Sequence, residues 1–209
     1  MVPVLESHLA GRRNIARYLH DTICQDLVVL ALSLARSQRD LNSNPASAPG
    51  LGRALELIDR CSSDLRVLNA VLAPPLVDQM AAKPALDWYV ELLRMDANLD
   101  VQFEYVTTPG GGITPDPLTR TILLAAVQTW AERAVGRQVA TGTLLRLTAG
   151  PHGFEFEFLS GQAGDPAVEA VLTCPLLLTD LRRIGGQMAI VPDHSGSSAR
   201  LTFCGTAEL

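Results

Sequence analysis

The sequence has few of the features that mark membrane-spanning, metal-binding and nucleic-acid-binding proteins. A membrane-spanning helix needs an apolar run of about eighteen residues, and none of the 209 residues lies in a run of that length. The sequence also lacks the pattern of a signal peptide, in which a charged segment is followed by an apolar one and then by small residues. The four histidines show no metal-ligand spacing, and a net charge of −5 argues against a nucleic-acid surface. We therefore expect a cytoplasmic protein with no membrane segment, no metal and no nucleic-acid partner.

Cysteine is also scarce, and its placement excludes a disulfide framework and a C-x-x-C redox or metal site. The four cysteines are scattered along the chain: Cys24, Cys61, Cys174 and Cys204. In a reducing compartment we expect free thiols, mostly packed. Apolar residues, by contrast, make up 47% of the chain, which is enough for a sizeable core.

One uninterrupted helix is predicted from before Arg12 to about Leu41, because this stretch contains no Pro or Gly. Its apolar residues recur at helical spacing: Ile15, Ala16, Leu19, Ile23, Leu27, Leu30 and Leu34. At about 100° per residue, His20 lies roughly 60° from the centre of this stripe, so we expect a half-exposed imidazole. Asp21 and Gln25 are four residues apart and share a polar face.

His20 has an ordinary interpretation and a functional one. The ordinary one is a boundary histidine that packs against an apolar face. In the functional one, a neutral imidazole nitrogen accepts a phosphoryl group near neutral pH. The adjacent Asp21 carboxylate orients the ring and takes its proton, and the Gln25 amide holds a water in line for hydrolysis of a phosphoryl group on a partner protein.

The surrounding residues favour the functional interpretation. The motif Arg-x-Ile-Ala-Arg-x-Leu-His-Asp-x-x-x-Gln-x-Leu, over residues 13–27, resembles the phosphoacceptor box of the histidine kinase subfamily that includes the nitrate and desaturase-regulating sensors. The run Leu-Ala-Pro-Pro-Leu-Val-Asp, over residues 72–78, resembles the exit from the second helix of that family. The resemblance implies that His20 is the acceptor, Asp21 the acid/base and Gln25 the water-positioning residue of a phosphatase reaction. It also implies a response-regulator receiver domain as the partner.

A second helix is predicted from about Leu51 to Leu72, after a loop over residues 42–50, and Pro74-Pro75 ends it. Two helices joined by a short loop form an antiparallel hairpin, which cannot cover its own apolar faces. A four-helix bundle made from two copies can cover them, so we expect a homodimer. Five residues should line it: Leu30, Leu34, Leu55, Ile58 and Leu65.

The rest of the chain predicts a second domain, so that residues 1–76 form the helical hairpin and residues 77–209 an α/β sandwich. Helices are expected over residues 84–96, 116–135 and 175–184, with a cap near Thr114 or Asp116 for the second. Strands are expected over 101–105, 143–148, 154–159, 187–191 and 199–204, with 160–174 irregular. This order indicates an α+β protein in which helices cover one face of a mixed sheet. It resembles the ATP-binding domain of histidine kinases.

The resemblance implies an ATP site in this second domain, but the residues depart from the family pattern. Where the long helix of the family carries Glu and, four residues later, a magnesium-holding Asn, this chain has Thr129 and Arg133, and Glu132 is one residue out of phase. Arginine cannot ligate a cation. If Gly161 is the first glycine of the family's Asp-x-Gly-x-Gly box, Leu159 replaces the Asp, and leucine cannot accept a hydrogen bond from adenine.

The glycine-rich lid of the family also has no counterpart. Residues 165–178 contain no glycine whose backbone could approach phosphates. Gly185-Gly186 matches the Gly-Gly that precedes a late strand in the family, but that turn is structural. We therefore predict no ATP use and no cofactor.

Three functions remain open. The leading one is a histidine phosphotransferase-like protein of two-component signalling, which exchanges a phosphoryl group between His20 and response-regulator aspartates, or hydrolyses it, without ATP. The second is a non-catalytic pseudokinase scaffold that dimerises or sequesters a regulator. The third is a divergent active sensor histidine kinase. Transfer of label from a phospho-regulator would distinguish the first, and magnesium-ATP binding the third.

Overall fold

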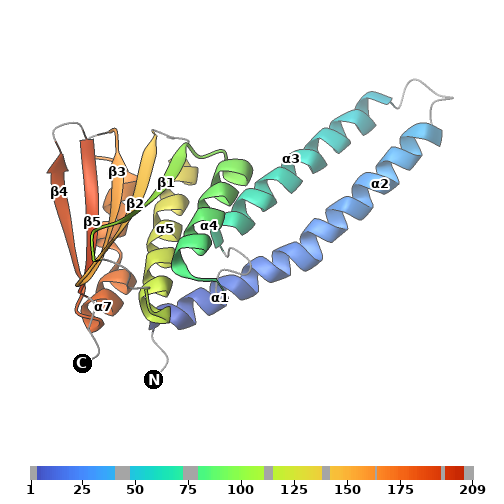
Figure 1. Ribbon diagram of the computed structural model, residues 1–209. Coiled ribbons are helices and arrows are strands. Elements are labelled where there is room, and N and C mark those ends of the chain that lie inside the picture. The colour runs from blue at the N-terminus through green and yellow to red at the C-terminus, as the bar shows by residue number, and fades with distance from the viewer. Residues whose placement is uncertain are drawn as a thin grey trace.

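The fold is α+β, as predicted: a long helical hairpin projects from a layer of helices packed on a five-stranded mixed sheet (Figure 1). The computed structural model describes residues 4–40, 48–72, 80–110, 115–137, 142–162, 164–193 and 196–204. The predicted boundary between residues 76 and 77, and the predicted cap at Thr114, lie outside the described residues.

The hairpin has the two helices that its apolar pattern predicts. The first consists of α1 (Val4–Tyr18), a π-helical turn over Leu19–Cys24, called the π turn below, and α2 (Gln25–Asp40). The second is α3 (Ala48–Leu72), which packs along α1, the π turn and α2. The π turn was not expected from the sequence.

The sheet has the strand order β1-β2-β3-β5-β4. Its strands are β1 (Val101–Thr107), β2 (Thr143–Gly150), β3 (Gly153–Ser160), β4 (Gln187–Asp193) and β5 (Gly196–Cys204). β1 runs parallel to β2, and every other pair is antiparallel. Each predicted strand is present, because the period-two alternation that predicted it reflects burial of one face.

Alternate side chains of the central strands build the core on one face of the sheet. Leu145 and Leu147 on β2 and Phe156 and Phe158 on β3 are fully buried, and they join the core that α4 (Ala82–Ala97) and α5 (Pro117–Arg137) complete. Phe156 and Phe158 meet edge to face with ring centroids 5.1 Å apart. The sheet domain (residues 80–204) therefore has an enclosed apolar core, which Val71 from the end of α3 joins.

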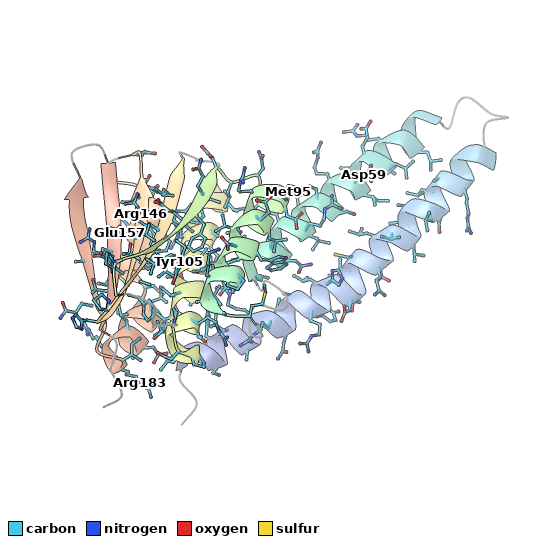
Figure 2. All side chains as sticks on the ribbon, in the orientation of Figure 1. Asp59, Met95, Tyr105, Arg146, Glu157 and Arg183 are labelled. Atoms are coloured by element: carbon cyan, nitrogen blue, oxygen red, sulfur yellow. The ribbon has the colours of Figure 1, made fainter. Side chains whose placement is uncertain are left out.

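The opposite face of the sheet carries charges paired across four strands. Glu104 contacts Arg146 at 2.7 Å, and Arg146 lies 3.8 Å from Glu157 (Figure 2). Arg200 contacts Glu157 at 2.7 Å and Glu155 at 2.8 Å. Alternating cross-strand charges explain why Glu157 is buried although it points away from the apolar core.

The helix α5 begins where the sequence indicates. The Asp116 side chain accepts hydrogen bonds from the backbone N–H groups of Leu118 and Thr119, at 2.8 and 3.0 Å, and from the Thr119 hydroxyl at 2.6 Å. Burial acts to raise the pKa of Asp116, but these hydrogen bonds outweigh it and lower the pKa. Asp116 is therefore the N-cap, one of the two predicted candidates.

The expectation that residues 160–174 are irregular was wrong, because α6 (Pro166–Thr173) lies within them. Asp165 caps this helix through the Ala167 N–H at 2.8 Å, and Pro166 stands in the first turn, where a missing N–H costs nothing. Val168 and Val171 are buried against the core. An eight-residue helix shows too little periodicity to be found by pattern, although Asp-Pro before an apolar run is a start signal.

The last helix, α7 (Pro175–Arg183), is followed by the predicted structural glycine turn. Gly185 has a φ of +72°, which L side chains rarely adopt, and a Cβ on Gly186 would collide with the Leu181 side chain. Both glycines are therefore required by the backbone and by packing.

Candidate functional site

The three predicted site residues lie together on the solvent side of the hairpin. His20 and Asp21 belong to the π turn, and Gln25 is the next residue after it. All three side chains are exposed, so the imidazole is more accessible than the predicted half-exposed group. A group that must meet another protein's phosphoryl group has to be accessible in this way.

The π turn changes the angular relation between His20 and Gln25. In a regular α-helix, residues five apart differ by about 140° around the axis. A turn with i→i+5 hydrogen bonds is wider and moves such residues toward one side. The π turn therefore brings the Gln25 amide closer to the side of the helix that carries His20.

The apolar spacing of the helix gives a physical reason for the wide turn. Half-buried apolar side chains recur every four residues at Leu19, Ile23, Leu27 and Ala31. In a regular α-helix each four-residue step drifts by about 40°, so three steps would turn Ala31 roughly 120° away from Leu19. One wide turn absorbs part of this drift and keeps the four side chains toward α3.

Exposed apolar side chains surround the site. Of the nine large apolar side chains that are exposed within the described ranges, eight lie on the hairpin: Ile15, Tyr18, Val28, Val29, Leu30, Leu32, Leu57 and Leu68. Among the predicted bundle residues, Leu30 is exposed and Leu34, Leu55 and Leu65 are half-buried, whereas Ile58 is buried within the single chain. So many exposed apolar side chains on one hairpin are typical of an interaction face.

The three arginines before His20 do not share one exposed face. Arg17 is exposed, but Arg12 and Arg13 are half-buried. Arg13 donates to the Leu9 carbonyl oxygen at 3.3 Å, and Arg12 pairs with Glu132 of α5. Glu132, which is out of phase with the family's pattern, thus faces the base of the hairpin.

The positions compared with a nucleotide site hold groups with other roles. The Thr129 hydroxyl donates to the Ala125 carbonyl oxygen at 2.8 Å within α5, and the Arg133 side chain is exposed. Strand alternation places Leu159 on the charged face of the sheet, beside the row that contains Glu157, and Gly161 is exposed after the strand. These four residues do not converge on one point.

The polar groups that do meet at the end of β3 were missed by the sequence reasoning. The Ser160 hydroxyl donates to Asp165 at 2.6 Å, and both residues are buried. The same carboxylate caps α6, whose Ala167, Val168 and Val171 are buried beside α5. This end of the strand is therefore occupied by an apolar helix and its cap.

The described cysteines and acidic side chains form no second candidate site. Cys24 and Cys174 are half-buried and Cys61 is exposed, so the expectation of mostly packed thiols holds for two of the three described cysteines. Among the residues with described positions, no three His, Cys, Asp or Glu side chains are grouped as metal ligands. In the same part of the chain, no helix has both the length and the apolar character for crossing a bilayer.

Comparison with known proteins gives one family match, and it lies over the hairpin. Residues 11–77 match the HisKA_3 family model, described as histidine kinase. No curated protein matches the chain.

Three solved structures resemble the fold at low identity. A bacterial phosphotransferase is 12% identical with a TM-score of 0.45, and the alignment covers 97% of this chain and 96% of that one. The histidine kinase domain of the Erythrobacter litoralis EL346 blue-light activated histidine kinase is 8% identical (TM-score 0.40, 86% and 94% covered). The Acinetobacter baumannii histidine kinase AdeS is 12% identical (TM-score 0.44, 87% and 96% covered). Scores this low transfer no function.

Proposed function

We propose that this chain is a two-component signalling protein of the histidine kinase family, and that it exchanges phosphoryl groups with response regulators without making them from ATP. The observation that carries the proposal is the exposure of His20, Asp21 and Gln25 together at the π turn. The partner would be the receiver domain of a response regulator, and the active form a homodimer built through the exposed apolar face of the hairpin.

The proposed transfer uses the three side chains in different ways. The unprotonated nitrogen of the neutral His20 imidazole attacks the phosphorus of an aspartyl phosphate, and the bond between phosphorus and the aspartate oxygen breaks. The regulator's carboxylate leaves, and Asp21 takes the proton from the other ring nitrogen, so that a neutral phosphohistidine forms. The reverse step passes the group to another regulator. In hydrolysis, the Gln25 amide orients the attacking water.

The second domain supports transfer without ATP. Magnesium bound to a nucleotide takes oxygen ligands from protein side chains. The helix α5 presents a threonine hydroxyl bonded to its own helix and an arginine at the compared positions, and Leu159 is on the opposite face of the sheet. The apolar helix α6 lies within residues 165–178, the glycine-free stretch compared with the family's lid. These residues do not fit magnesium-ATP.

The test is transfer of radiolabel from purified phospho-regulator to the protein. Acid-labile label should appear on the parent protein and vanish in His20→Ala. His8 is a matched control, because it is exposed on the same helix, and His8→Ala should keep the label. A scaffold would bind the regulator without acquiring label, and it would leave the lifetime of the phosphoryl group unchanged.

Two further variants separate the roles. Asp21→Asn keeps the size but removes the charge, and it should slow transfer and hydrolysis by about two to four orders of magnitude. Gln25→Ala should slow hydrolysis alone, because the amide makes no bond to the group in transfer. Melting temperatures of all variants should stay close to that of the parent, since these side chains are exposed. Calorimetry with millimolar magnesium-ATP should give no binding; micromolar affinity would favour an active kinase.

A further inference from the structure

A polar junction, called the Arg12 junction below, joins the base of the hairpin to the sheet domain. The Arg12 guanidinium donates to the carbonyl oxygens of Val71 at 3.4 Å and Leu72 at 3.5 Å, at the end of α3. The same guanidinium forms an ion pair with Glu132 on α5. Two residues of the sheet domain donate to the same carbonyls: the Gln128 amide to Leu72 at 3.4 Å and the Tyr89 hydroxyl to Val71 at 3.5 Å.

The chemistry of these groups explains why they meet. The last carbonyls of a helix have no intrahelical partner and carry the negative end of the helix dipole. A guanidinium has five donors in a planar fork, so it can bond to adjacent carbonyls and to a carboxylate at once. Burial lowers the pKa of Arg12, yet arginine stays protonated in proteins, so its half-buried charge needs these partners.

We infer that Arg12 is a positioning residue that holds the His20-bearing hairpin in one fixed arrangement with the sheet domain. Its side chain is the point at which α1, the end of α3 and α5 meet, and Leu9, one turn earlier, packs on the sheet-domain core. In Figure 1 the end of α3 reaches α4, and α1 lies below α4 near α5. His20 is eight residues away, about 12 Å along the helix, so Arg12 does not touch the reacting atoms.

The arrangement has a functional consequence that rests on the proposed function. Because His20 is only about 12 Å along the helix from the Arg12 junction, we expect a receiver domain that docks at His20 to reach the sheet domain as well. If the two parts were free to rotate, each docking would have to restrict that rotation and would lose affinity. A fixed sheet domain presents one ready surface, so losing the Arg12 junction should weaken docking without changing the chemistry at His20.

The first measurement is hydrogen exchange, which does not depend on any activity. Arg12→Ala should speed amide exchange by about tenfold or more in residues 4–11 and 66–72, because both segments lose their anchor, while β2 and β3 keep theirs. Arg12→Lys keeps the charge without the fork and should give a smaller increase. Arg17→Ala is the matched control, since it removes an exposed guanidinium from the same helix and should change neither segment. Unchanged exchange in Arg12→Ala would overturn the inference.

Glu132→Gln tests the same junction if Arg12→Ala fails to fold. It removes one charge from a partly exposed side chain and keeps its volume, so the domain should stay folded. Exchange in residues 4–11 should still rise several-fold, because the guanidinium loses its only charged partner among the described residues. The same protein is then used for kinetics.

The second measurement is the rate of label transfer against regulator concentration. Arg12→Ala and Glu132→Gln should raise KM by about tenfold, or about 1.4 kcal/mol, and leave kcat within about twofold. General destabilisation would instead lower kcat per molecule without raising KM. An unchanged KM in a protein whose exchange has risen would overturn the docking consequence. If the parent protein acquires no label at all, the proposed function is wrong. The hydrogen-exchange result would then still test whether Arg12 fixes the arrangement of the two parts.

Discussion

The hairpin and the sheet domain differ in how far their apolar side chains are buried. In the sheet domain, most large apolar side chains of β2, β3, α4 and α5 are buried. In the hairpin, only Ala16, Ile58, Ala70 and Val71 are buried among the described side chains, and eight large apolar ones are exposed. The difference shows that the sheet domain satisfies its own core, whereas the hairpin leaves apolar surface for another molecule.

The difference also separates two kinds of mutation. In a complete core, truncating a side chain leaves a cavity whose cost falls on that domain alone. On an exposed apolar surface, a charged substitution changes the stability of the single chain little, and it weakens association once a partner would bury the charge.

The largest effect should follow from charges on the exposed hairpin surface. Leu30→Glu with Leu34→Glu should abolish the homodimer, because each covered leucine contributes about 1.5–3 kcal/mol and two copies lose four of them. Light scattering should give the monomer mass, and hydrogen exchange should rise in α2 and α3 but not in β2 or β3.

Met95 provides the control for this prediction. It is 75% exposed, but it lies on α4 outside the hairpin (Figure 2). Met95→Glu should therefore keep the dimer mass. If the unmodified chain ran as a well-folded monomer, the comparison between a complete and an incomplete region would fail.

A cavity in the sheet domain should have the next largest effect. Phe156→Ala removes a fully buried ring that meets Phe158 edge to face, and it should lower the free energy of unfolding by about 3–5 kcal/mol. Urea unfolding followed by circular dichroism measures this change. Ile15→Ala, at an exposed hairpin position, should cost less than about 1 kcal/mol in the same experiment. Equal losses would contradict the difference between the two regions.

The π turn should decide which position serves hydrolysis. Gln25→Ala should slow dephosphorylation of the regulator by about tenfold to a hundredfold, and adding Cys24→Gln should not restore it. In a regular α-helix, position 24 would be the one stacked near His20, and the relocated glutamine would rescue the rate. Cys24→Gln alone is the control for local perturbation. Recovery in the double variant would show that the turn is not wide.

The smallest effect should come from the N-cap of α5. Asp116→Ala removes three accepted hydrogen bonds and should lower stability by about 1 kcal/mol. The hydrogen bonds lower the pKa of Asp116, so this contribution is present above the unfolded pKa of about 3.9 and is lost as the pH falls through the folded pKa. Asp116→Asn should keep most of the cap and lose the pH dependence, as measured by thermal unfolding between pH 2 and 7.

Much of the fold could be predicted because periodicity records burial. Helices over residues 12–41 and 51–72 and all five strands are present near their expected positions. The Asp116 cap and the Gly185-Gly186 turn could be recognised from residue type, since each meets a local backbone requirement. The predicted roles of His20, Asp21 and Gln25 stay predictions, because they concern a reaction with another protein.

The features that could not be predicted from the sequence depend on residues that are distant along the chain. The helix α6 is held by Ser160 and by α5, and its eight residues are too short to show a period. Likewise, nothing near Arg12 in sequence identifies Val71, Leu72 and Glu132 as its neighbours.

The sequence by itself determined which segments become helix or strand and which residue types stand at the phosphoacceptor motif, because propensity, capping and periodic burial act over a few residues. Only the tertiary structure decided that the first helix widens at His20 to keep Leu19, Ile23, Leu27 and Ala31 toward α3. It also decided that Arg12 binds the end of α3 and Glu132. The physical reason is that a helix register and a buried charge are fixed by what packs against them, and those partners are brought together only by folding.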